Sequence, residues 1–201
     1  MRTVLPGRSS PIPGTRVPGH SRRPCDERGG SCPPRERGGG PMRLLLRANA
    51  HRHVGGACWE VAASPDTPRR ERWQWQVCLL AGDRGHADAP SPTALRVAAP
   101  LPGGTTVEVA ADPLTVAPAV EVLDPGSSPT VVRTDGELVV LIASGGRVLV
   151  EERHLLADAD ALVLAGDDPL VVGVRRPDGS DSRLAVVRLA PVQDSALSWV
   201  P

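Results

Sequence analysis

The chain has 201 residues, a length that suits one domain with a sizeable core, and it contains no Phe, Tyr or Lys. Its formal net charge of zero divides unevenly: residues 1–41 carry 8 Arg and 3 acidic residues, 8 − 3 = +5, which leaves −5 for residues 42–201. A mildly acidic body without a basic cluster excludes nucleic acid as the expected partner.

The first segment, residues 1–41, contains eight Pro and eight Gly and shows no apolar periodicity. This composition predicts a disordered leader. Met42 opens a different pattern and is a candidate for the true translation start, with a genuine flexible tail as the alternative. No run in the chain approaches the roughly 18–20 apolar residues of a membrane span, and the N-terminus lacks the apolar core of a secretory signal. A cytoplasmic protein without a membrane partner is therefore expected.

From Met42 to residue 201 the sequence predicts one β domain. Val-rich segments favour strands because β-branched side chains fit a pleated, half-buried surface. Turn signals recur roughly every 8–12 residues, which is typical of sandwiches and barrels, and no segment has a long helical stripe. The expected strands span 42–48, 58–63, 73–80, 94–99, 105–110, 113–117, 129–133, 137–143, 146–151, 161–165, 169–175 and 183–189.

Two turns carry further expectations. The polar stretch 177–179 separates the apolar segments 170–174 and 184–189, a pattern that predicts a hairpin. Asp158 and Asp160 precede the apolar segment 161–164. This stretch is similar to the Gly-Asp-Ala-Leu-x-Leu turn of many cupins, and the similarity implies that the acid stabilises the turn.

The sequence offers little for catalysis. Cys25, Cys32, Cys58 and Cys78 form no C-x-x-C pair, so they are interpreted as reduced cysteines that bind no metal. A Gly-x-Ser-x-Gly motif is absent, and no Ser or Cys stands beside a recognisable base. We expect no catalytic residue and no cofactor.

The tryptophans are the only aromatic residues. Trp73 and Trp75 share one face of their strand because they are two residues apart, and Trp59 lies on the neighbouring strand. Core filling is the first interpretation. The functional alternative is a stacking wall for a small planar or ureido-type ligand at the mouth of a barrel. Trp199 is expected to dock the C-terminal tail.

Several short motifs follow one another in an order known from one family. They are MRLLLRA at 42–48, Gly55-Gly56, WEVAASP at 59–65, WQVCL at 75–79, PLPGG at 100–104, and the Pro-Thr to Asp-Gly segment at 129–136. The ordered set resembles the HutD/Ves-like family, cupin-type proteins encoded with histidine-utilisation enzymes, over about residues 42–175. The resemblance implies a cupin-like double-sheet jelly roll or β-sandwich of bicupin type, with little helix.

The resemblance also points to candidate ligand-binding residues, which are Gly55, Gly56, Trp59, Glu60 and Trp75. Several polar positions of the family differ here. Its Trp-Lys-Asn-Gly-Gly-Gly stretch has shrunk to 53–56, and its Thr-Arg pair is Cys58-Trp59. The chain therefore resembles the family more in its scaffold than in its site.

A metal-binding cupin is the alternative reading of the same region. His51-x-His53 followed by Glu60 is similar to the paired His and Glu of metal cupins. The gap from His53 to Glu60 is seven residues, whereas the cupin motif has four or five, and a third His could come only from His86 or His154. Surface histidines explain these residues better.

The preferred interpretation is a non-catalytic HutD-like domain that binds a small metabolite, or acts as an accessory or regulator, in amino-acid catabolism. By resemblance the metabolite would be an intermediate of histidine breakdown such as N-formimino-glutamate. The alternatives are a metal-dependent cupin dioxygenase or isomerase, and a degenerate scaffold for a protein partner. A homodimer paired through sheet edges is compatible with the resemblance.

Overall fold

The computed structural model describes residues 42–65, 74–82, 93–166 and 170–192, together with Leu197 and Trp199. These residues fall within one compact unit, Gly38–Pro201. The predicted leader, residues 1–41, lies outside the described residues. Within the described part, no helix is long and apolar enough to span a membrane.

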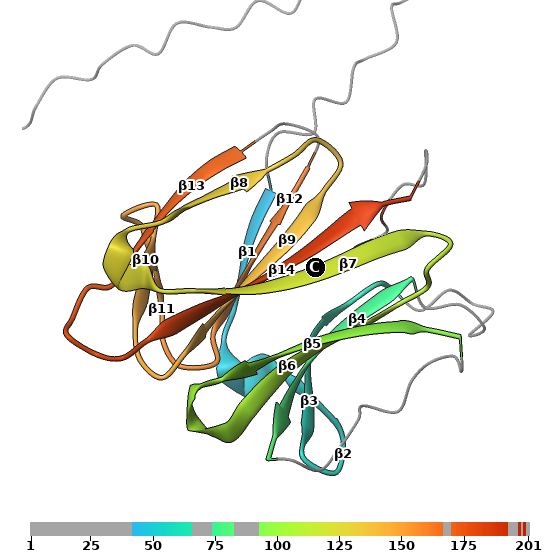
Figure 1. Cartoon of the computed structure of the whole chain (residues 1–201), viewed down its shortest axis with the longest axis horizontal. Coiled ribbons are helices and arrows are strands. Elements are labelled where there is room, and N and C mark those ends of the chain that lie inside the picture. Colours follow the sequence, from blue (N-terminus) through green and yellow to red (C-terminus); the bar gives the residue numbers. More distant parts are fainter. Residues whose placement is uncertain are drawn as a thin grey trace, which may run out of the picture. The chain divides into compact units, whose positions relative to one another are not determined.

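The described residues of the domain form three antiparallel sheets (Figure 1). The central sheet contains β1 (Met42–Leu46), β12 (Ala161–Ala165), β9 (Leu138–Ser144), β14 (Arg183–Pro191) and β7 (Val116–Leu123), in that order. A second five-stranded sheet contains β2 (Arg52–Gly55), β3 (Cys58–Ala63), β4 (Trp75–Ala81), β6 (Thr105–Ala111) and β5 (Leu95–Leu101). The third sheet contains β11 (His154–Leu156), β10 (Val148–Val150), β13 (Leu170–Arg175) and β8 (Thr130–Arg133).

The central sheet is buried on both faces. Along β9, Val140 and Ile142 enter one hydrophobic core and Leu141 enters the other, and all three are fully buried. Neighbours along a strand point to opposite faces, so an uninterrupted apolar run is stable only where both faces are covered. The runs at 138–143 and 184–187 meet this condition.

Two large cores follow from this layering, beside a small buried cluster of Cys58, Cys78 and Leu80. The first core lies between the central sheet and the second five-stranded sheet, and Trp75 is its largest fully buried side chain. The second core lies between the central sheet and the four-stranded sheet and is made of Val, Leu and Ala. Leu197 and Trp199 pack against the first core, in agreement with the docking predicted for Trp199.

The predicted all-β class is confirmed. Helix is limited, within the described residues, to the 3-10 turns Ala48–Ala50, Pro102–Gly104 and Pro125–Ser127. Two strands were missed. β2 is an exposed edge strand with little apolar content, and β11 has only three residues, so neither carries a periodicity that sequence reading can detect.

Two predictions about strands were wrong. The strand expected at 113–117 begins at Val116 and continues to Leu123 through Pro118. Proline is tolerated there because β7 is an edge strand, where an N–H can be spared. The hairpin expected between 170–174 and 184–189 does not form, because β13 pairs with β8 and β10 whereas β14 pairs with β9 and β7. The chain changes sheets between the two strands.

Candidate functional site

A pocket of about 220 Å³ opens at one end of the first core. It lies where the β1–β2 connection and the β11–β12 turn meet the inner face of the second sheet. The lining residues are Ala48, His51, Trp59, Leu79, Ala81, Thr105 and Ala159. Two of the residues singled out from sequence, His51 and Trp59, therefore meet in one cavity.

The register of the second sheet fixes where the pocket ends. Trp59 pairs with Leu79, and Ala81 pairs with Thr105, so these side chains form the last two rows of the inner face. Trp75 precedes Leu79 by four residues on the same strand, about 13 Å at the usual rise. It is fully buried in the first core and takes no part in the pocket lining.

Asp160 holds the wall that carries His51. This buried carboxylate accepts hydrogen bonds from the backbone N–H of Ala48 at 2.9 Å and of Ala157 at 3.0 Å. It also forms an ion pair with Arg47 at 2.6 Å. Burial opposes the ionisation of Asp160, but the two N–H groups and Arg47 outweigh it and lower its pKa. The turn-stabilising role predicted for this acid is confirmed, and the bonds tie the β1–β2 connection to the β11–β12 turn.

His51 lies on this wall of the pocket. Its Nε2 is buried and has no hydrogen-bond partner in the described part of the chain. Burial lowers the pKa of the imidazole below its ordinary value of 6.5, and the nearby Asp160 carboxylate opposes this shift only in part. Near neutral pH the side chain is therefore an uncharged imidazole, able to donate or accept a hydrogen bond depending on its tautomer.

Trp59 forms the exposed side of the site, with 38% of its surface accessible. The His53 ring lies against it with centroids 5.7 Å apart, and His53 Nε2 lies 2.9 Å from the Gly56 carbonyl oxygen. Gly56 has φ +54°, the left-handed region that favours glycine, in the β2–β3 turn. Gly55 and Gly56 thus shape the turn behind Trp59 and do not line the pocket.

Glu60 is directed away from this site. It follows Trp59 on β3 and so points to the opposite face of the sheet. There it receives two hydrogen bonds from Arg52, both 2.9 Å, and one from Gln76 at 2.6 Å. The structure therefore does not gather His51, His53 and Glu60 into one ligand set, and no group of three or more His, Cys, Asp or Glu suited to a metal occurs among the described residues.

Other reactive side chains lie on that outer face. Cys58 and Cys78 are both buried there. Burial, reinforced by the neighbouring Cys58, raises the pKa of the Cys78 thiol far above its usual range, so it remains protonated. Glu108, also buried, forms an ion pair with Arg96 at 2.7 Å. Cys25, Cys32, Trp73 and His86 lie outside the described residues.

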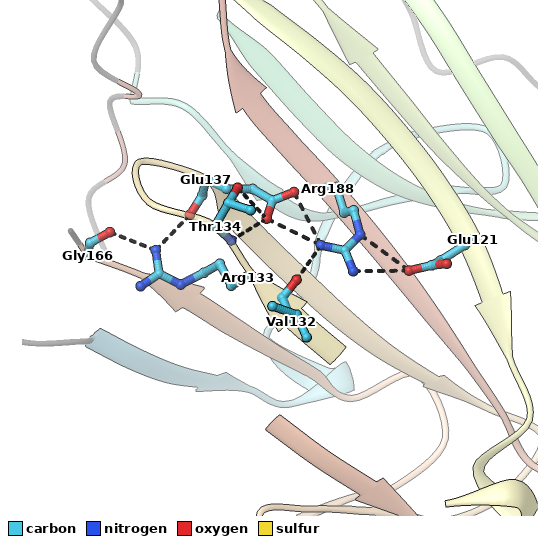
Figure 2. A network of polar contacts seen from close by, with 7 residues as sticks. All are labelled: Glu121, Val132, Arg133, Thr134, Glu137, Gly166 and Arg188. Atoms are coloured by element: carbon cyan, nitrogen blue, oxygen red, sulfur yellow. Dashed lines mark hydrogen bonds and ion pairs between the residues drawn. The ribbon is translucent and has the colours of Figure 1, made fainter. Parts of the chain in front are cut away.

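A second polar cluster surrounds the β8–β9 turn (Figure 2). Arg188 of β14 donates to the Val132 carbonyl at 2.8 Å and to both Glu137 carboxylate oxygens at 3.3 Å, and it reaches Glu121 on β7. Arg133 donates to two backbone carbonyls, those of Glu137 and Gly166. These bonds join β8 to the central sheet, so we assign the cluster a structural role.

Sequence reading found only part of the pocket. It identified Trp59 as a stacking candidate, but it considered His51 only as a weak metal-ligand candidate or a surface histidine. Ala48, Leu79, Ala81, Thr105 and Ala159 carry no chemical signal and join the site only because the sheets bring them together. The alternation of inner and outer residues along β4 was the available clue for Leu79 and Ala81.

Comparison with known proteins places the fold in a class. No protein-family model and no curated protein sequence matches the chain. The structure is similar to that of a conserved protein of unknown function from Pseudomonas aeruginosa PAO1, with a TM-score of 0.60 and 14% identity over 75% of this chain and 100% of that chain. The chain has a cupin-like β-sandwich fold.

The particular likeness within that class is to HutD from Pseudomonas fluorescens SBW25. Here the TM-score is 0.52 and the identity 12%, over 76% of this chain and 100% of that chain. At these identities the similarity establishes a HutD-type fold. The fold expected from the sequence motifs is thereby confirmed.

Proposed function

We propose that residues 42–201 form a non-catalytic, HutD-type binding domain that holds a small metabolite in the pocket between His51 and Trp59. The observation that carries the proposal is the pocket itself, about 220 Å³ in volume and lined by both His51 and the partly exposed Trp59. Trp59 offers a flat surface on which a small ligand can stack.

The biological setting of the proposal comes from the sequence motifs. Their resemblance to the HutD/Ves-like family supports an accessory or regulatory role in amino-acid catabolism in the cytoplasm, with histidine breakdown as the first candidate. N-formimino-glutamate is the metabolite to test first. The pocket volume lies below the roughly 300–1,000 Å³ typical of drug-sized ligands, which supports a small metabolite.

Thermal denaturation of the full chain with histidine and its breakdown products, N-formimino-glutamate among them, tests the proposal. A ligand at ten times its Kd stabilises the folded state by about 1.4 kcal/mol, which raises Tm by about 3–6 °C in a domain of this size. The Trp59→Ala variant should lose the shift. Leu155→Ala is the matched control, since Leu155 is a similarly exposed apolar side chain on the four-stranded sheet.

Two results would contradict a metabolite-binding domain. One is the absence of any stabilising compound in the panel. The other is a shift that Trp59→Ala retains in full, because the compound would then bind elsewhere on the protein.

A further inference from the structure

In the described part of the chain, four residues other than glycine have a left-handed backbone, and one of them lines the pocket. They are Ser128, Glu151, Glu152 and Ala159. Ala159 has φ +61° and forms part of the pocket wall. A residue with a side chain is strained in this conformation, and strain of this kind clusters at functional sites. At Ala159 the strain and the cavity coincide.

Ala159 occupies a turn position that favours glycine. The Asp160 N–H donates to the Ala157 carbonyl at 3.0 Å, which closes a four-residue turn with Ala159 in its third position. Where a turn requires a positive φ at that position, glycine is the usual residue. The chain places glycine at nine other described positions with positive φ. Alanine at this one keeps a methyl group where glycine would relieve the strain.

Hydrogen bonds to the end of β9 hold the turn in its strained form. The Ala159 N–H donates to the Ala143 carbonyl at 2.8 Å, and the Ala143 N–H donates to the Asp160 carbonyl at 3.0 Å. The Asp158 carboxylate accepts a hydrogen bond from the Gly145 N–H at 2.8 Å. Because the surrounding bonds fix the backbone, the Ala159 methyl group has one defined position in the pocket wall.

The pocket is enclosed by two walls of different origin. Ala159 and Ala48 come from the β11–β12 turn and the β1–β2 connection, whereas Trp59 and Leu79 come from the second sheet. A flat ring stacked on Trp59 therefore lies between the second sheet and the turn. A cavity of about 150 Å³ holds a benzene-sized ring. This pocket, at about 220 Å³, has room for one ring with a small substituent.

We propose that Ala159 determines the size of the ligand that the pocket accepts, because its methyl group limits the ring stacked on Trp59 to a single, unfused one. The proposal rests on the proposed function, since it assumes that this pocket binds a small metabolite. Replacing the methyl group by hydrogen enlarges the pocket beside the ring, so that a fused second ring gains access. One methyl group in an apolar pocket changes the discrimination between two ligands by about tenfold or more.

NMR titration of the full chain measures this selection. The indole N–H signal of Trp59 is assigned by its loss in Trp59→Phe. The two probes are uncharged near neutral pH: pyrazole is a single ring, and indazole carries a second ring fused to the first. The ratio of the indazole Kd to the pyrazole Kd should fall about tenfold or more in Ala159→Gly.

Two further variants test the position in the opposite direction and control for the backbone. Ala159→Asn keeps a residue that tolerates a left-handed backbone but adds atoms to the wall, so it should weaken pyrazole binding about tenfold or more. Ser128→Gly is the matched control, since Ser128 is also left-handed, with φ +51°, but is exposed and does not line the pocket. It should leave both dissociation constants unchanged.

Thermal denaturation separates ligand selection from packing, because Ala159 is half-buried and also packs against the first core. The Tm of Ala159→Gly should stay within about 2 °C of the unmodified chain, since the relief of strain offsets the lost methyl contact and the greater freedom of glycine in the unfolded chain. A fall of several degrees would show that the methyl group serves packing, and the proposal would be wrong.

The binding outcomes separate this inference from the proposed function. An unchanged ratio of the two dissociation constants in Ala159→Gly would overturn the role of Ala159 while leaving a ligand-binding pocket in place. A Trp59 signal that responds to neither probe would overturn the single-ring ligand. Failure of the metabolite panel as well would remove the proposed function.

Discussion

Replacing Trp75 with alanine tests the packing of the first core most directly. Trp75 is fully buried among aliphatic side chains. The chain has no Phe or Tyr that could fill part of the same volume. A buried Trp removes about 150–250 Å² from water, worth about 4–6 kcal/mol at roughly 25 cal/mol per Å². Alanine keeps a small part of this, so Trp75→Ala should lower the free energy of unfolding by about 3–5 kcal/mol.

Phenylalanine at the same position separates volume from hydrogen bonding. The indole Nε1 of Trp75 is buried without a hydrogen-bond partner among the described residues. Trp75→Phe therefore breaks no described hydrogen bond and removes an unsatisfied donor, so its cost should stay near about 1–2 kcal/mol. Trp59→Ala is the matched control, because its indole is 38% exposed, and should cost about 1–2 kcal/mol.

Urea denaturation followed by far-UV circular dichroism measures all three variants without relying on tryptophan fluorescence. The slope of the free energy of unfolding against urea concentration should be the same in all three variants. Differences in the midpoint then report differences in stability alone. A loss below about 1 kcal/mol for Trp75→Ala would refute the burial of this side chain. Equal losses for Trp75→Phe and Trp75→Ala would show that the indole N–H has a partner that the described residues do not contain.

Four further measurements address the site and the ends of the domain. Asp160→Asn should lose about 1–3 kcal/mol of stability, because a buried backbone N–H loses its acceptor. Arg47→Gln should lose less than about 1 kcal/mol, since the Arg47 side chain is 55% exposed. Equal losses for the two variants in urea denaturation would contradict this expectation. Because the pKa of His51 is lowered in the folded state, the unfolded chain binds a proton at a higher pH than the folded chain does. The free energy of unfolding should therefore fall as pH drops below about 6.5. His51→Gln should remove the part of this fall that comes from His51. A stability difference between the two proteins that is independent of pH would show that His51 is not desolvated. Deleting residues 1–41 should change Tm by no more than about 1–2 °C, and a loss of several degrees would show that the segment packs on the domain. The full chain expressed in metal-rich medium should carry well under one equivalent of Fe, Mn, Ni, Cu or Zn by elemental analysis, whereas a full equivalent that disappears in His51→Ala or His53→Ala would overturn the non-catalytic proposal.

The candidate site was predictable only in its aromatic part. Trp59 stands out in a chain with few aromatic residues, and its strand was placed correctly at 58–63. The pairing of His51 with Trp59 was not predictable. It depends on the hydrogen bond that the Ala48 N–H in the β1–β2 connection donates to the Asp160 carboxylate, more than 100 residues further along the chain. The opposite placements of Trp59 and Glu60 follow from strand alternation, which sequence alone provides once the strand is assigned.

The sequence by itself determined the class of fold and the burial of its central strands. Uninterrupted apolar runs such as 138–143 require cover on both faces, and the Pro- and Gly-rich turns limit each strand to a few residues. Only the tertiary structure decided which strands pair: β13 joins the four-stranded sheet and β14 the central one, although they are consecutive along the chain. The physical reason is that side-chain alternation sets which face of a strand is apolar. The choice of neighbouring strand depends instead on how all the apolar faces can be covered together. It also depends on hydrogen bonds made by Arg188 and Asp160, whose partners are distant in sequence.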